Sequence, residues 1–165
     1  MQQMEFQTRG VDFTDTPFEH WQRPEWIELA HQAQNWSLSQ FMHGEQGALL
    51  CTAKIVETVP WIDAKYYAAT QVMDEARHAE VFRKRALANG GGLLMSRGSS
   101  EGLLRTIIDA KSYTQATALM HLLGEGFILD IFRMGELIAP SPVEKRMFRM
   151  AMQDEARHVA YGTMH

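Results

Sequence analysis

The chain has 165 residues, a formal net charge of −4 at pH 7 and one cysteine, Cys51. This length fits one domain with a single core, and the mild negative charge gives no sign of a nucleic-acid partner. A lone cysteine excludes a disulfide within the chain and a cysteine-based zinc or iron–sulfur site.

Targeting and membrane segments are not visible in the sequence. The N-terminus has no basic segment followed by an apolar one, so no signal peptide is predicted. No run of about 18 uncharged apolar residues is present, so no membrane span is predicted. We therefore expect a cytoplasmic protein.

The first half of the chain predicts an arm and two long helices. Residues 1–23 are mixed polar and aromatic, and we expect them to form an N-terminal arm ahead of a bundle domain at 24–165. Pro24 suits the first turn of a helix, which we expect to run to about residue 58, because Pro60 follows. A second helix over 61–88 ends at a Gly-rich segment.

The second half predicts a long connection and two further helices. Residues 89–100 are rich in Gly and Ser, and a short helix over 101–111 precedes a long one over 113–137. Ser141 is a predicted N-cap, with Glu144 completing a capping box, for a last helix from Pro142 to the chain end. No segment alternates as a strand does. The predicted fold is all-α: a four-helix bundle with a long crossover between helices two and three.

One five-residue motif occurs twice. Asp-Glu-Ala-Arg-His stands at 74–78 and again at 154–158, and a single glutamate lies 30 positions ahead of each motif glutamate, Glu45 before Glu75 and Glu125 before Glu155. The midpoints of the two glutamate pairs are Pro60 and Pro140. If each proline marks the turn of a helical hairpin, the paired glutamates stand level across it, about 22 Å from the turn.

This spacing predicts a metal centre. Glu75 and His78 are three residues apart and share one helix face, as the second motif's pair does. Di-metal carboxylate bundles take one Glu from each of two helices and Glu-x-x-His from each of the other two. Four buried carboxylates would repel without cations, and two divalent ions would cancel their charge. The predicted ligands are Glu45, Glu75, His78, Glu125, Glu155 and His158.

The remaining motif residues are predicted to support the histidines. Metal-bound histidines commonly donate their second N–H to a carboxylate. We expect Asp74 and Asp154 each to accept such a bond from the histidine of the opposite helix, with Arg77 and Arg157 neutralising the aspartates.

Over residues 25–165 the pattern resembles the ferritin-like di-iron carboxylate superfamily. Asp-Glu-x-Arg-His in both motif helices is similar to its oxygen-activating branch, which includes ribonucleotide reductase small subunits, di-iron monooxygenases and N-oxygenases. The resemblance implies two iron ions (Fe²⁺/Fe³⁺), O₂, a small-molecule substrate and an external electron donor. Manganese or a mixed pair stays open, because both metals accept these ligands.

Two positions differ from known members, and a third is a candidate for a shared feature. Phe82 occupies the place where ribonucleotide reductase small subunits carry a radical tyrosine, and Leu129 the place of a threonine in multicomponent monooxygenases. N-oxygenases of this type have a third histidine ligand, for which His121, one turn before Glu125, is the candidate; a core or rim histidine is the alternative. The metal ligands are the only catalytic residues that we predict.

The leading interpretation is a non-haem di-iron oxidase or monooxygenase acting on a small organic substrate. The alternatives are a ferritin- or rubrerythrin-like ferroxidase or peroxidase, and a non-enzymatic metal-binding bundle. The chain stops soon after His158, so we expect further cover from a longer natural chain, a partner or a homodimer. Four glycines flank the lone glutamates and predict either room beside the site or close helix contacts: Gly44, Gly47, Gly124 and Gly126.

Overall fold

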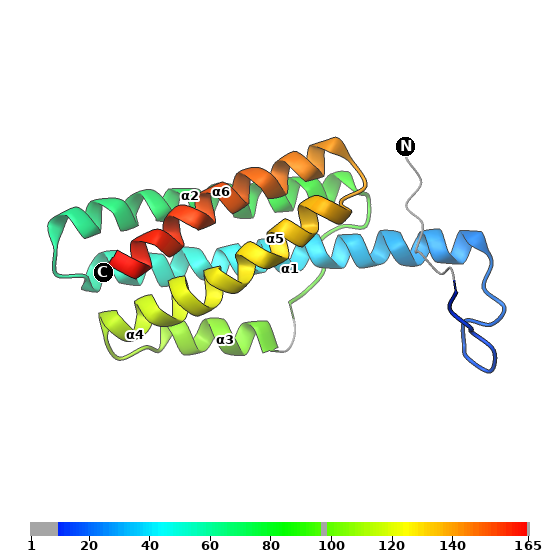
Figure 1. Ribbon diagram of the computed structural model, residues 1–165, viewed down its shortest axis with the longest axis horizontal. Coiled ribbons are helices and arrows are strands. Elements are labelled where there is room, and N and C mark those ends of the chain that lie inside the picture. The colour runs from blue at the N-terminus through cyan, green and yellow to red at the C-terminus, as the bar shows by residue number, and fades with distance from the viewer. Residues whose placement is uncertain (1–9, 97–98, 165) are drawn as a thin grey trace.

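The structure, a computed structural model, describes residues 10–96 and 99–164. In this part of the chain all regular structure is helical (Figure 1). The elements are α1 (Arg23–Thr58), α2 (Ile62–Ala88), α3 (Ser99–Ile108), α4 (Tyr113–Thr117), the π-helical stretch η1 (Ala118–Glu125), α5 (Gly126–Ile138) and α6 (Pro142–Met164). None of these described helices combines the length and the apolar character that crossing a bilayer requires.

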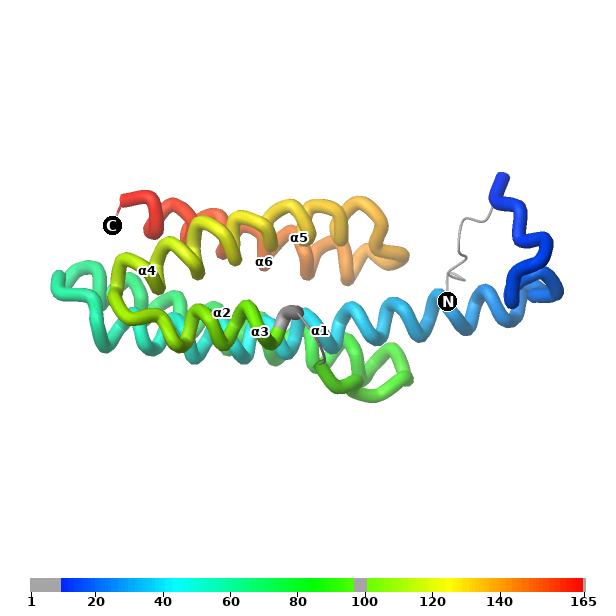
Figure 2. The backbone as a smooth tube through the Cα atoms, turned by 90° about the horizontal axis from the view of Figure 1, so that it is seen from below, coloured from blue at the N-terminus to red at the C-terminus, as the bar shows by residue number. Residues whose placement is uncertain are grey.

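Two antiparallel hairpins form the bundle. α1 and α2 turn at residues 59–61, and α5 and α6 turn at residues 139–141, so both proline turns predicted from the sequence are confirmed. The two turns lie at opposite ends of the bundle, and the connection between the hairpins, which includes α3, crosses its length (Figures 1 and 2). Lys65 Nζ stabilises the first turn by donating to the carbonyls of Val56 and Glu57 at the end of α1.

The first turns of α1 extend past the other helices (Figure 2). Glu25 accepts a hydrogen bond from the backbone N–H of Gln22 at 3.0 Å and so caps the helix start. The rings of Phe13 and Trp21 each lie 5.0 Å from that of Trp26. The described part of the predicted arm, residues 10–22, therefore packs on the start of α1, and residues 1–9 lie outside the described part.

The crossover contains one short helix, slightly earlier than predicted. α3 packs on α1 through Leu104, which lies where a Cβ on Gly47 would stand, so Gly47 provides a close helix contact. Gly44, by contrast, has nothing within 4 Å of such a Cβ. Lys54 Nζ donates to the carbonyls of Ile108 and Ala110 and thereby caps the C-terminus of α3.

The predicted N-cap at Ser141 is confirmed, but the capping box is not. The Ser141 hydroxyl accepts the Glu144 N–H at 3.2 Å. The Glu144 carboxylate is 1 % exposed and accepts from the Ser141 hydroxyl at 3.1 Å, from Arg85 Nε at 3.0 Å and from Gln34, but not from the backbone N–H of Ser141. This buried acid therefore ties the start of α6 to α2 and α1.

The third long helix is not the continuous α-helix that the sequence predicts. Residues 118–125 are π-helical, a geometry that is rare beyond single turns and frequent at functional sites. Gly124 permits the wide turn, because a Cβ there would lie 3.3 Å from the Leu119 carbonyl oxygen five residues earlier. Periodicity predicts the helix but does not distinguish i→i+5 from i→i+4 bonding.

Two apolar clusters fill the bundle and leave a polar layer between them. The cluster toward the first turn includes Cys51, Ile55, Ala68, Met120 and Tyr161. The cluster toward the second turn includes four phenylalanine rings whose centroids lie 5.2–5.9 Å apart where they pack: Phe41, Phe82, Phe132 and Phe148. Phe82 is fully buried there.

Replacing Phe82 tests this packing. Phe82→Ala leaves a cavity among rings that cannot collapse onto it, so we expect a loss of about 3–5 kcal/mol in unfolding free energy. Val81→Ala, next to it and 39 % exposed, serves as the control and should change stability by less than about 0.5 kcal/mol. Urea unfolding of the metal-free variants by circular dichroism measures both. Equal losses in the two variants would contradict the packing described.

Candidate metal centre

The polar layer consists of the six residues predicted as ligands. Each is at most 6 % exposed, and α1, α2, η1 and α6 each contribute at least one. Their ligand atoms form two overlapping groups within which all atoms lie within 4.8 Å of one another. The groups are Glu45, Glu75, His78 and Glu155, and Glu75, Glu125, Glu155 and His158. Glu75 and Glu155 belong to both, so the layer could hold two metal ions.

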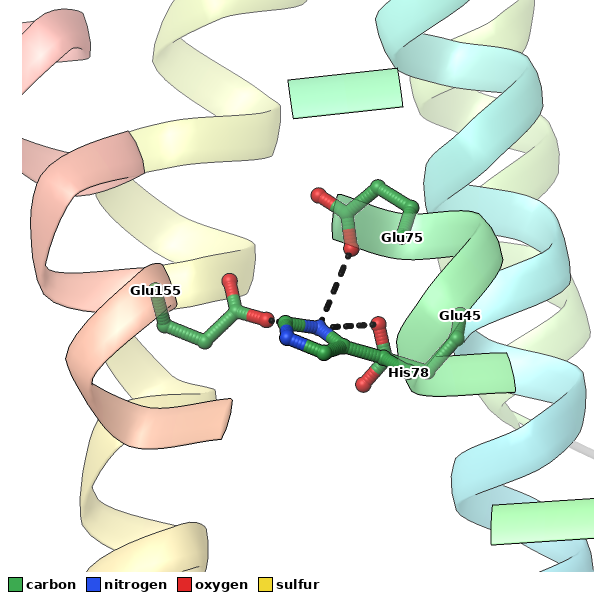
Figure 3. A group of neighbouring side chains, drawn as sticks. All are labelled: Glu45, Glu75, His78 and Glu155. Atoms are coloured by element: carbon green, nitrogen blue, oxygen red, sulfur yellow. Dashed lines mark ion pairs between the residues drawn. The ribbon is translucent and has the colours of Figure 1, made fainter. Parts of the chain in front are cut away.

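The His78 ring points one nitrogen into the group and the other away from it. Its Nδ1 lies 3.1 Å from Glu155 Oε1 and 3.6 Å from Glu45 Oε2 (Figure 3). Its Nε2 lies 3.1 Å from Asp154 Oδ2. A neutral ring that donates Nε2–H to Asp154 leaves the Nδ1 lone pair aimed at the carboxylates, which is the orientation that a metal ligand needs.

The His158 ring has the same arrangement. Its Nδ1 lies 3.1 Å from Glu155 Oε2 and 3.4 Å from Glu75 Oε1, and its Nε2 lies 3.2 Å from Asp74 Oδ2. Each aspartate therefore contacts the histidine of the opposite motif helix, the contact expected from the sequence.

The two arginines bridge the two aspartates. Arg77 Nη2 donates to Asp74 at 2.7 Å and to Asp154 at 2.6 Å, and Arg157 Nη2 donates to Asp154 at 2.5 Å and to Asp74 at 3.3 Å. Both arginine side chains are 54 % exposed, so the bridge adds only modestly to stability. Its effect is to hold each aspartate in contact with a histidine Nε2 atom.

Three buried atoms of this layer lack a hydrogen-bond partner among the described residues: Glu75 Oε2, Glu125 Oε2 and His78 Nδ1. A buried polar atom without a partner costs about 1–3 kcal/mol. All three are atoms of the two groups that could hold an ion, and oxygen and imidazole nitrogen suit iron, manganese and zinc. The residues present therefore fit a divalent cation pair.

The acids of the layer differ in their proton affinity. Burial raises the pKa of Glu45 and Glu125 well above the usual range, and the neighbouring carboxylates add to the rise. Burial also acts to raise the pKa of Glu155, but the close rings of His158 and His78 outweigh it and hold that pKa below its usual value. In the absence of metal, protons must therefore replace part of the missing positive charge.

The two histidines hold protons in the metal-free layer. Burial opposes their charged forms, but the close carboxylates outweigh it, so the pKa of His78 and that of His158 are raised. A metal must displace these protons, because only the neutral imidazole binds it.

His121 lies outside both groups. It is fully buried, and its Nε2 lies 3.0 Å from the amide oxygen of Gln71. Gly162 makes room for it, since a Cβ on Gly162 would collide with the His121 side chain. Burial and the nearby His158 lower the pKa of His121 to about 4.

Gln71 is the functional-site residue that the sequence did not reveal. It is fully buried, and its Nε2 donates to Glu125 Oε1 at 2.6 Å and to Glu75 Oε1 at 3.0 Å. The sequence indicated its role only through its position, four residues before Glu75 and on the same helix face. Glutamine on a helix is usually exposed, so that indication was weak.

Comparison of the chain with protein-family models, with curated proteins and with solved structures finds no match. The site therefore has to be interpreted from its own geometry: an all-helical protein with two buried Glu/His groups that could bind metal ions.

The proton content of the layer predicts how stability depends on pH. The pKa values of Glu45, Glu125, His78 and His158 are all raised in the folded metal-free protein above the ordinary values of 4.5 and 6.5, so above those values these groups hold protons to higher pH than they do in the unfolded chain. The folded state then binds more protons than the unfolded state, so stability falls as pH rises. The Glu155 shift acts below pH 4.5 and is outside this window.

Thermal unfolding of the metal-free protein should therefore show a midpoint that decreases from pH 7 to pH 9. Addition of Mn²⁺ should reduce or reverse this slope, because metal replaces the protons and binds more tightly as pH rises. A midpoint that increases over this range without metal would contradict the assignment of protons to the layer.

Proposed function

We propose that this chain is a non-haem di-iron oxidoreductase of the ferritin-like type, an oxidase or monooxygenase that uses O₂ to oxidise a small organic substrate. The observation that supports it most is the set of six buried ligand side chains, with both histidines held through Nε2 by an aspartate of the opposite helix. In this proposal Glu45, Glu75, His78, Glu125, Glu155 and His158 are the metal ligands.

When bound, a pair of iron ions would supply O₂ activation and electron transfer. The protein's part is to orient the metal ligands and to exclude water. Asp154 and Asp74 hold His78 and His158 with Nδ1 facing the acids, and Glu75 and Glu155 are available to both ions. On one side, the buried rings of Phe82 and Phe132 exclude water next to the ligands.

In this proposal the electrons come from another molecule. One cysteine cannot form a rubredoxin-type site, and no nucleotide-binding fingerprint is present in the sequence. The proposal therefore includes an external donor, either a partner protein or a small reductant.

Two other functions use the same ligand set. A ferroxidase or peroxidase would bind the same metals, but the duplicated Asp-Glu-x-Arg-His with its cross-helix contacts resembles oxygen-activating enzymes more closely. A bundle with a purely structural role does not require buried carboxylates such as those of Glu75 and Glu125, because apolar packing stabilises a bundle at lower cost.

Removal of a shared ligand tests the metal assignment. Glu155→Ala takes away a carboxylate common to both groups, so we expect bound iron to fall from two ions per chain to fewer than one. Glu80→Ala removes an exposed acid of α2 that pairs with Arg83 and serves as the control, with iron retained. Elemental analysis after anaerobic Fe²⁺ loading and desalting measures both. Two ions per chain in Glu155→Ala would overturn the ligand set.

Reaction with O₂ distinguishes the three functions. An oxidoreductase should consume about one O₂ per loaded iron pair, with a transient absorption change, and then stop until reductant is added. Continued oxidation of many added Fe²⁺ ions per chain into a mineral would mean iron storage instead. Stable Fe²⁺ in air would mean a structural metal. Stopped-flow absorption and an oxygen electrode give these measurements.

A further inference from the structure

The repeat of 80 residues is broken directly beside the ligands. The position that repeats Gln71 is Ala151, and the position that repeats Phe41 is His121. Likewise, Gly162 repeats Phe82. The ligand set is therefore duplicated, whereas the residues one turn away from it are polar at one end and aromatic at the other.

Gln71 links the acids to His121 at the polar end. Its Nε2 donates to Glu75 and Glu125, and its oxygen faces His121. His121 then donates through Nε2–H. Gly162 leaves space for the His121 ring, and the ring of Tyr161 packs against it at a centroid distance of 5.2 Å.

As a result, the two lone glutamates have different contacts. Glu125 is held through Oε1 by Gln71 at 2.6 Å, and its Oε2 is buried and free to bind an ion. Glu45 contacts His78 Nδ1 at 3.6 Å, the same atom that a metal would take. Among the described residues no donor outside the ligand set binds Glu45. Fewer contacts therefore fix the Glu45 side chain before metal binds, so fixing it on metal binding costs more side-chain entropy.

We propose, on the basis of the di-metal function proposed above, that Gln71 is a positioning residue that makes the two metal positions unequal. The position formed by Glu75, Glu125, Glu155 and His158 binds the first ion, and the position of Glu45 and His78 binds the second. Partners of ligand side chains change metal affinity by about 10- to 100-fold when they are removed, and we expect a difference of that order between the positions.

Sub-stoichiometric metal tests this order. Crystals of the protein loaded with one equivalent of Mn²⁺ should show the anomalous signal mainly beside His158, with little beside His78. In Gln71→Leu the first position should lose about 10- to 100-fold in affinity, and the two signals should become similar. Gln153→Leu, an exposed glutamine of α6, should retain the wild-type ratio.

The outcomes separate this inference from the function on which it rests. Equal signals in the wild type, a stronger signal beside His78, or an unchanged ratio in Gln71→Leu would overturn the role of Gln71 and leave the di-metal site standing. No manganese or iron at either position would overturn both. Because Gln71→Leu leaves buried groups unpaired and could fail to fold, the wild-type ratio and a two-step Mn²⁺ titration of the wild type decide the order independently.

Discussion

Four carboxylates buried at one level of a helical bundle are the constraint on which the rest of the structure depends. Isolated buried charges are too costly to persist, so each of these acids must have a proton, a hydrogen bond or a cation. Protonated histidines and the hydrogen bonds from Gln71 satisfy part of this need. The buried oxygens Glu75 Oε2 and Glu125 Oε2 have no partner among the described residues. A pair of divalent ions would bind these two oxygens.

The bundle is built so that this layer is sealed on both sides. The hairpins turn at residues 59–61 and 139–141, at opposite ends, so that each end of the bundle combines the turn of one hairpin with the open ends of the other. The aliphatic cluster around Ile55 closes one side and the phenylalanine cluster around Phe82 closes the other. On the α2 and α6 face, the pairs of Asp74 and Asp154 with the arginines form a charged cover over the histidines.

Most of this arrangement could be predicted from the sequence, for physical reasons. Helical geometry is regular, so a spacing of 30 residues around a proline places Glu45 level with Glu75, and a spacing of three places Glu75 and His78 on one face. The cross-helix contact of Asp154 with His78 follows from the need of a ligand histidine for a partner. The π-helical stretch and the contacts of Gln71 could not be predicted, because they depend on which side chains fill the space between helices. A sequence does not show that Gly162 leaves that space for His121.

The break in the repeat has a chemical consequence for the two ends of the layer. A phenylalanine ring offers no conventional hydrogen bond, so Phe82 and its neighbours can separate the ligands from water but cannot orient them. At the other end Gln71 links His121 to Glu125 and Glu75 through three hydrogen bonds of 2.6–3.0 Å. Duplication alone would have produced the same surroundings at both metal positions. Gln71 stands where the repeat has Ala151, and His121 stands where it has Phe41. The bonds of Gln71 therefore reach Glu125 and the shared Glu75, whereas Glu45 has no such bond among the described residues.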